Sequence, residues 1–221
     1  MQLDNKPGTL FWTCKLAVDG DGDPRCYNPN GRPPGLDFLA NAGHPGNWWG
    51  LACDGEGIPF IQEASDPAPG FFVSTTSLED HSLAASNPRR YVNSGQIPFV
   101  VLPSKPKFSP AQMLGDLFVV FNEKSSKMTW ALYADVGPAN QIGEGSIALN
   151  TALGLSGDCQ RGGTEEEIIA MIYFPGSAIG WPRPTDELAK AAYDHFIAWG
   201  GYESARAALP QINWDQFPPL L

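Results

Sequence analysis

Hydrophobic residues in this chain of 221 residues fall mainly into short runs, and segments rich in glycine, proline and polar residues separate them. Short apolar runs bounded by turn residues are typical of buried strands. The clearest runs are residues 10–18, 97–102, 117–122 and 130–136, and the segment EEIIAMIYF that ends at the turn FPGS. Two further strand candidates are residues 71–75 and a segment that opens at Trp48 and Trp49 and continues through Cys53. This pattern predicts a mainly β chain.

Helical spacing of apolar positions occurs at two places. Residues 147–155, IALNTALGL, predict a short helix with Ser146 as its N-cap and Gly154 as its stop. Beyond residue 185, apolar positions recur at helical spacing at Leu188, Ala191, Ala192, His195 and Phe196. We therefore predict one or two helices in the C-terminal tail, with His195 as a core residue rather than a base.

Composition supports many turns and short strands in one domain. Hydrophobic residues make up 43% of the chain and charged residues 17%, with 24 glycines and 21 prolines. The formal net charge is -10. An acidic surface repels nucleic acid and anionic membranes and attracts cationic ligands. We expect neither a nucleic-acid partner nor a membrane, since no apolar run approaches the ~20 residues of a span.

Four cysteines, Cys14, Cys26, Cys53 and Cys159, form no CxxC motif, and the three histidines lie far from them in sequence. We therefore expect no zinc site and predict two disulfides, for which three pairings are open. The first residues, MQLDNKPGTL, lack the basic and apolar regions of a signal peptide. We expect a secreted protein, either a mature form with Met1 added or one exported by another route.

The candidate chemistry lies in the stretch from Met128 to Leu155, where Asp135 ends a predicted strand and Glu144 precedes the predicted helix. Two acids separated by a turn can face each other across a cleft. Glycosidases use such pairs, about 5–5.5 Å apart for retention and about 6.5–9.5 Å apart for inversion. The alternative interpretation is a pair of solvated turn acids at the surface.

Several motifs resemble a known family. ADVGP followed by GEGSIALNTALG resembles the strand–turn–helix signature of double-psi β-barrels. With NAGHPGNWW, DPAPGFFVSTTSL and FPGS in the same order, the chain most resembles the chitosanases of glycoside hydrolase family 75. The resemblance implies a six-stranded double-psi β-barrel-like core with short helices and a C-terminal helical tail. It implies one catalytic domain over residues 1–221, with a barrel core at 10–180 and a helical extension at 185–221.

The resemblance also implies an activity. Asp135 and Glu144 would be the catalytic pair of an endo-chitosanase that hydrolyses β-1,4 bonds between glucosamine units with inversion. By analogy with other double-psi barrel glycosidases, Glu144 is the general acid and Asp135 the base. Two physical effects favour the opposite assignment. A helix N-terminus lowers the pKa of a nearby carboxyl, which suits Glu144 as a base, and the end of an apolar strand raises it, which suits Asp135 as an acid.

Candidate substrate-binding residues are acids, aromatic residues and hydroxyls: Asp19, Asp21, Trp48, Trp49, Ser74, Thr75 and Ser146. For the Asp19–Asp23 segment one alternative is a turn held by Asp side chains. Another is a third catalytic acid at Asp19, because some double-psi glycosidases of other families carry their general base on the first strand. A calcium loop is disfavoured because Asn30 stands where its last carboxylate belongs. Adjacent strand residues point to opposite faces, so either Trp48 or Trp49 can face a cleft. For the hydroxyls the alternative is turn capping.

Two other functions stay open at the level of sequence. One is a glycosidase that cleaves peptidoglycan, for instance a delivered antibacterial effector. The other is a non-hydrolytic, wall-binding barrel of the expansin type, which needs one acid where this chain has two. For the chitosanase we expect a monomer that acts on a cationic polysaccharide without cofactor or metal.

Overall fold

The computed structural model describes residues 2–3 and 8–219; the other residues, which include much of the segment examined for signal-peptide features, lie outside the described part. Six strands form a closed barrel in the order β2–β8–β5–β7–β6–β9, because β9 also pairs with β2. They are β2 (Leu10–Asp19), β5 (Phe99–Pro103), β6 (Leu117–Asn122), β7 (Lys127–Gly137), β8 (Glu144–Ser146) and β9 (Thr164–Phe174). The predicted fold class is confirmed.

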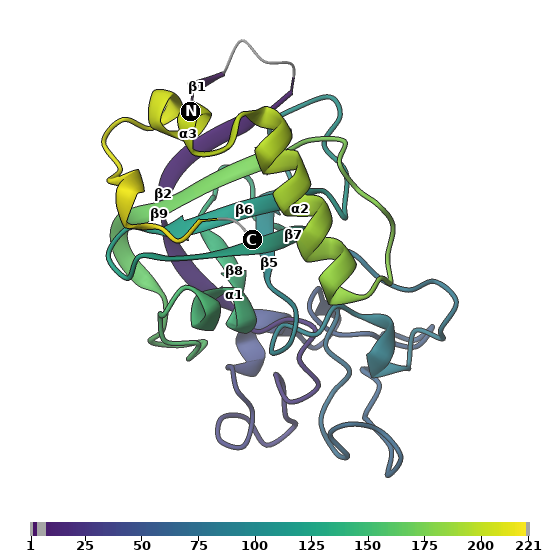
Figure 1. Cartoon of the computed structure of the whole chain (residues 1–221). Coiled ribbons are helices and arrows are strands. Elements are labelled where there is room, and N and C mark those ends of the chain that lie inside the picture. The colour runs from purple at the N-terminus through teal and green to yellow at the C-terminus, as the bar shows by residue number, and fades with distance from the viewer. Residues whose placement is uncertain (1, 4–7, 220–221) are drawn as a thin grey trace.

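Smaller elements decorate this barrel. Strand β1 (Gln2–Leu3) pairs with β2, and β3 (Gly43–His44) pairs with β4 (Asn47–Trp48) in a separate two-stranded sheet. The helices are α1 (Ile147–Ala152), α2 (Thr185–Trp199) and α3 (Gly201–Ala208), with 3-10 turns at Leu39–Ala42, Pro88–Arg90 and Trp214–Gln216. In Figure 1, α2 lies across the strands, and the long irregular segments between β2 and β5 gather below the barrel.

Alternating residues of the strands supply two hydrophobic clusters. Leu117, Val119 and Phe121 of β6 belong to a cluster that also contains Phe196 of α2 and Trp214. On the opposite face of the same strand, Phe118 and Val120 join side chains of β2, β5, β7, β9 and α1. The period of two expected for strands therefore fixes which face each residue buries. The C-terminal helices cover one of these faces.

Several predictions need correction. Trp48 ends the short strand β4, but the predicted strand does not continue from it to Cys53. Residues 49–53 and 71–75 form only isolated bridges, such as Leu51 with Ser74, because they cross an irregular region. His195 is exposed rather than part of the core, although its ring stacks on Phe174 at 5.6 Å between centroids. Its neighbours at helical spacing, Leu188 and Phe196, are buried as predicted.

The prediction of two disulfides is not confirmed, since all four cysteines are described as thiols. Cys14 and Cys26 are buried, and Cys53 and Cys159 are partly buried.

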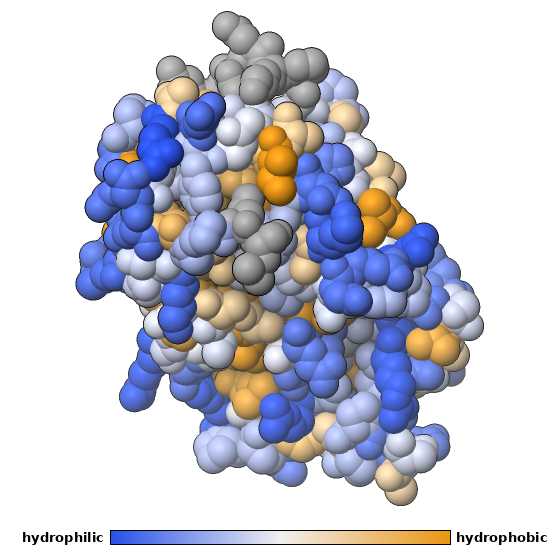
Figure 2. Space-filling view, viewed as in Figure 1, coloured by the Kyte–Doolittle hydropathy of each residue, from blue (hydrophilic) through white to orange (hydrophobic). Residues whose placement is uncertain are grey.

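The face in Figure 2 is mostly hydrophilic, and its hydrophobic groups are small and scattered. None of the helices in residues 2–3 and 8–219 is long and apolar enough to cross a membrane.

Candidate active site

Strand β5 brings the two predicted catalytic acids together. Val101 in β5 is the register partner of Asp135 in β7 on one side and of Glu144 in β8 on the other. Neighbouring strands are about 4.8 Å apart, so the Cα atoms of the two acids are separated by two strand spacings, roughly 10 Å. Two residues that a loop separates in sequence therefore flank one position of the sheet.

A bulge in β7 sets which residue occupies that position. Val100 pairs with Tyr133, but Val101 pairs with Asp135, so Ala134 is the extra residue. A bulge re-aims the side chains that follow it. It brings Asp135, rather than Ala134, into register with Val101 beside the cleft.

Two adjoining hollows form an acidic cleft around these residues. The larger, of about 580 Å³, is lined by Asp19, Asp21, Ala40, Asn41, Trp49, Val101, Asp135, Val136, Gly137, Pro138, Gln141 and Glu144. The smaller, of about 350 Å³, is lined by Asp21, Trp49, Thr75, Thr76, Ser77, Glu79, Tyr91, Asp135 and Val136. The hollows share Asp21, Trp49, Asp135 and Val136. No lysine or arginine of the described chain lines either hollow, so the cleft attracts cations.

Asp135 is held by three hydrogen bonds to a single oxygen. The Ser77 hydroxyl (2.6 Å), the Ser77 amide (2.9 Å) and the Val136 amide (2.8 Å) all donate to Oδ1. Burial raises the pKa of Asp135 above its usual value, and these hydrogen bonds oppose the rise because they favour the charged form. Oδ2 carries none of them.

Glu144 has a different environment. Its carboxyl lies beside Gly137, where an added Cβ would be 3.6 Å from Oε2. Burial, followed by the negative charges of Asp135 and Asp37, raises the pKa of Glu144. None of the causes of this shift lowers the pKa, in contrast to the hydrogen bonds that act on Asp135. Glu144 is therefore the acid of the pair that better retains its proton.

The turn after β2 supplies two more carboxyls. The Asp21 amide donates to Asp19 Oδ1 at 2.7 Å, and the Tyr27 hydroxyl donates to Asp21 Oδ1 at 2.6 Å. Burial raises the pKa of both acids; Asp21 and Asp135 add to the rise for Asp19, and Asp135 adds to it for Asp21. Four carboxyls thus line one hollow, and a protonated amine would relieve their repulsion.

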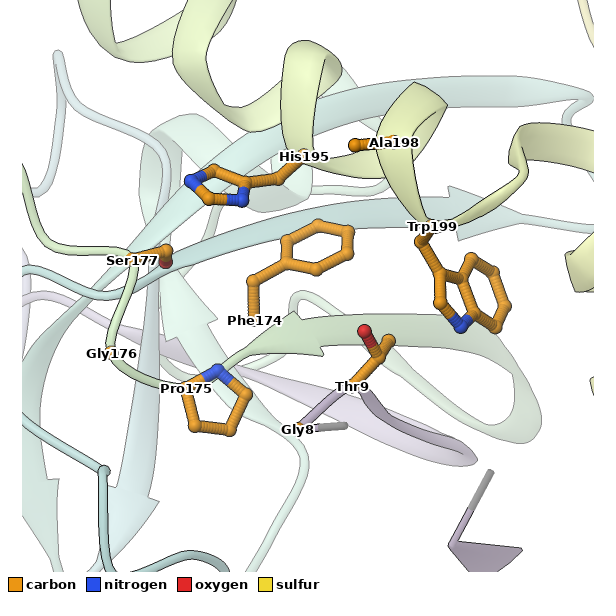
Figure 3. A pocket seen from close by; sticks show the side chains of 9 residues that line it. All are labelled: Gly8, Thr9, Phe174, Pro175, Gly176, Ser177, His195, Ala198 and Trp199. Atoms are coloured by element: carbon orange, nitrogen blue, oxygen red, sulfur yellow. The ribbon is translucent and has the colours of Figure 1, made fainter. Parts of the chain in front are cut away.

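A separate pocket of about 390 Å³ lies at the other end of β2 and is lined by Gly8, Thr9, Phe174, Pro175, Gly176, Ser177, His195, Ala198 and Trp199. Figure 3 shows the ring of His195, from α2, beside that of Phe174 at the end of β9. No carboxyl group lines this pocket, so it lacks the acid pair that glycoside hydrolysis needs. Within the described residues, no group of three or more His, Cys, Asp or Glu side chains is arranged to hold a metal ion.

Comparison with known protein families matches residues 52–199 to the fungal chitosanases of glycosyl hydrolase group 75. This chain belongs to that family. A search of curated proteins found no match. The matched part of this family member contains Asp135 and Glu144, whereas Asp19, Asp21 and Trp49 precede it.

The structure divides the predicted substrate-binding residues of this chitosanase-family chain into two groups. Asp19, Asp21, Trp49 and Thr75 line the acidic cleft. Trp49 is 60% exposed, and its indole Nε1 donates to the Asn41 carbonyl at 2.8 Å. This bond fixes the ring while leaving its face open, as a platform for stacking requires.

The other predicted residues lie behind the cleft. Trp48 packs against Tyr27 and Leu51 in a small hydrophobic cluster. The Ser74 hydroxyl is buried and accepts from the Gly22 amide at 3.0 Å. Ser146 is fully buried, and its hydroxyl accepts from the amides of Leu149 and Phe99, each at 3.0 Å. Both hydroxyls are buried and bonded to backbone amides, so in this structure they hold the backbone and do not face the cleft.

Sequence reasoning missed three contributors: Ser77, Tyr27 and Gln141. Ser77 holds Asp135 although 58 residues separate them. Tyr27 holds Asp21, and Gln141 lines the larger hollow. The hydroxyl patch that begins at Ser74 was a signal for Ser77, but the chain offers none that singles out Tyr27.

Proposed function

We propose that this protein is an endo-acting chitosanase that hydrolyses β-1,4 bonds between glucosamine units, with Glu144 and Asp135 as its catalytic pair. The observation that carries this proposal is the register of β5, which sets both acids on either side of Val101 at the edge of one acidic cleft. The family match gives the substrate class.

The two acids have the properties of an acid and a base. Glu144 keeps its proton, because burial and neighbouring negative charges favour the neutral form, and delivers it to the oxygen of the leaving sugar. Burial raises the pKa of Asp135, but three hydrogen bonds to Oδ1 favour its ionised form, so we assign Asp135 the role of base. Its Oδ2 accepts a proton from the water that attacks the anomeric carbon.

Inversion is proposed from the family resemblance. The strand spacing fixes only the Cα atoms, because the Glu144 carboxyl reaches Gly137 of β7, two residues from Asp135. An inverting enzyme has its carboxyls about 6.5–9.5 Å apart, with a water molecule between them. A retaining enzyme would need the carboxyls about 5–5.5 Å apart.

The cleft also supports endo-cleavage of a cationic polymer. Asp135 lines both hollows whereas Glu144 lines only the larger, so the cleft continues past the acid pair, as cleavage within a polymer requires. Asp19 and Asp21 face the larger hollow, where they would bind protonated amines, and the open ring of Trp49 would stack on a sugar face. Because such a polymer is found outside cells, we propose that the protein acts there.

The first test measures reducing-end release from well-deacetylated chitosan by wild type, Asp135→Asn and Glu144→Gln. We expect activity in wild type and a loss of about 10²–10⁴-fold in each variant, the usual contribution of a general acid or base. Glu56→Gln is the matched control, since Glu56 is an exposed loop acid. The anomeric configuration of the first product, followed by NMR, tests inversion.

Two outcomes would contradict the proposal. If Glu144→Gln kept more than about a tenth of the wild-type rate, the assigned site would be wrong. If wild type were inactive on chitosan but released reducing ends from purified peptidoglycan, the substrate would be wrong while the acid pair stood.

A further inference from the structure

The glycine between the two acids of the β2 turn packs on a pair of sulfur atoms. A Cβ built on Gly20 would lie 2.7 Å from Cys26 Sγ and 2.9 Å from Cys159 Sγ. Since both contacts are too short for a real Cβ, only glycine fits here. Two atoms this close to one point are less than about 6 Å apart, so a change of side-chain rotamer is the movement needed to reach the bonding distance of about 2.05 Å.

Polar contacts hold the two cysteine segments together independently of the sulfurs. Arg32 donates to Asp158 Oδ2 at 2.8 Å, and Gln160 donates to Asp37 Oδ1. Asp158 and Gln160 are the immediate neighbours of Cys159, and their partners belong to the segment that follows Cys26. The two segments are thus fixed side by side on both flanks of Cys159, which removes most of the ordering cost of a covalent link.

The other two cysteines have other surroundings. Cys14 lies in β2 within the cluster formed with α1, Leu16 and Ile169. The thiol of Cys53 points to the Leu51 carbonyl, 3.6 Å away. We propose that Cys26 and Cys159 form a disulfide when the protein is oxidised, and that Cys14 and Cys53 stay thiols.

The reaction proceeds by exchange with a small disulfide such as oxidised glutathione. The thiolate of Cys159, which is partly exposed, attacks one glutathione sulfur and releases the other as a thiolate. The buried Cys26 thiolate then attacks Cys159 Sγ, forms the Cys26–Cys159 bond and releases the second glutathione thiolate. The protein loses two protons and two electrons, and one glutathione disulfide becomes two thiols.

The raised pKa of Cys159 makes the exchange slow at neutral pH. Burial, followed by the charges of Asp37 and Asp19, raises the pKa of Cys159 to about 12. Only a small fraction is thiolate at neutral pH, so the rate rises with pH.

The test oxidises the full-length protein with glutathione disulfide at mildly alkaline pH, both native and during refolding from denaturant. Free thiols are then counted under denaturing conditions, and disulfides are located by peptide mapping. Wild type and the control Cys53→Ser should each lose two thiols, mapped to Cys26 and Cys159. Cys26→Ser and Cys159→Ser should form no internal disulfide.

A second readout is thermal unfolding of oxidised wild type with and without a thiol reductant. A link across a long chain segment should raise Tm by roughly 5–15 °C, and the reductant should abolish the gain. Cys53→Ser should show the same gain and Cys159→Ser none. Four free thiols in wild type after both oxidations, or a disulfide mapped to any other pair, would overturn the proposal.

Discussion

At the scale of single residues, the acid and the base of the site differ in the number of donors around them. Asp135 receives hydrogen bonds from Ser77 and Val136, whereas the neighbours that shift Glu144 are other carboxylates. Hydrogen bonds to a carboxylate favour ionisation, and nearby negative charge opposes it. Environment thus assigns the roles of two chemically similar groups.

Ser77→Ala tests this assignment. Removing the hydroxyl deletes one of three hydrogen bonds that lower the pKa of Asp135, so this pKa should rise. Because the base must be ionised, the acidic limb of kcat/KM should move to higher pH by the same amount, with the basic limb unchanged. The pH–rate profile on chitosan measures both limbs.

Ser82→Ala is the control, because the Ser82 hydroxyl donates to Asp80, outside both hollows. A profile of Ser77→Ala that moved only at its basic limb would assign Asp135 the acid role instead.

Residue identities in the cleft were only partly readable from sequence. Asp135 and Glu144 could be proposed because their motifs are specific. The sequence does not predict which of Trp48 and Trp49 faces the cleft, because the answer depends on which side of an irregular turn packs against the protein. Ser146 shows a different limit: its N-cap role was readable from local pattern, but its burial depends on β5, far away in sequence.

At the scale of elements, Ser146 joins α1 to the barrel. Its hydroxyl caps the helix at Leu149 and also accepts from Phe99 of β5. Beside it, Asn150 donates to the carbonyls of Gly145 and Ser146. The strand that bears Glu144 is therefore fixed at its C-terminal end.

Ser146→Ala should destabilise the protein by about 2 kcal/mol, because two buried amides lose their acceptor. For a chain of this length that corresponds to a decrease in Tm of roughly 4–8 °C, measured by calorimetry. Activity per folded molecule should change little if Ser146 is a cap rather than a sugar contact.

Ser86→Ala, in an exposed loop, is the matched control and should leave Tm unchanged. An unchanged Tm for Ser146→Ala with an increased KM would restore the substrate-binding role.

Most barrel strands were predictable because their apolar runs are long enough to bury. β8 was not predicted, since Glu-Gly-Ser has no apolar pattern and pairs only because β2 and β5 flank it. In the region between β2 and β5, the pattern of hydrophobic residues predicted more strand than the structure contains. Apart from Trp48 in β4, turns and isolated bridges satisfy the backbone where strands 48–53 and 71–75 were expected.

At the scale of the whole molecule, the acidic cleft has a cost in stability. Asp19, Asp21, Asp135 and Glu144 all have raised pKa values, and burial is the largest cause for each. A carboxyl whose pKa is higher in the folded than in the unfolded state stabilises the folded protein at low pH. This contribution to the free energy of unfolding is complete below about pH 4, the pKa of the carboxyl in the unfolded chain. That contribution is lost as pH rises through the folded pKa.

We therefore expect Tm to fall as pH rises from about 4 to 7, and Asp19→Asn to reduce the fall. Asparagine keeps an acceptor for the Asp21 amide while removing a buried charge. At pH 7 the variant should be more stable by about 1–2 kcal/mol, measured by denaturant unfolding. The control is Asp186→Asn, in the exposed first turn of α2. Equal slopes for wild type and Asp19→Asn would show that Asp19 does not carry this charge cost.

The register of β5 has a consequence for variation among relatives. The chain leaves the barrel at Gly137 and returns at Glu144, but the partners of Val101 hold the two acids in place. The hydrogen-bond lattice, not the connecting loop, sets their separation. Insertions or deletions between residues 138 and 143 would change the rim of the cleft, where Pro138 and Gln141 lie, and leave the reacting groups the same distance apart. Substrate range can thus diverge along this loop while the chemistry stays constant.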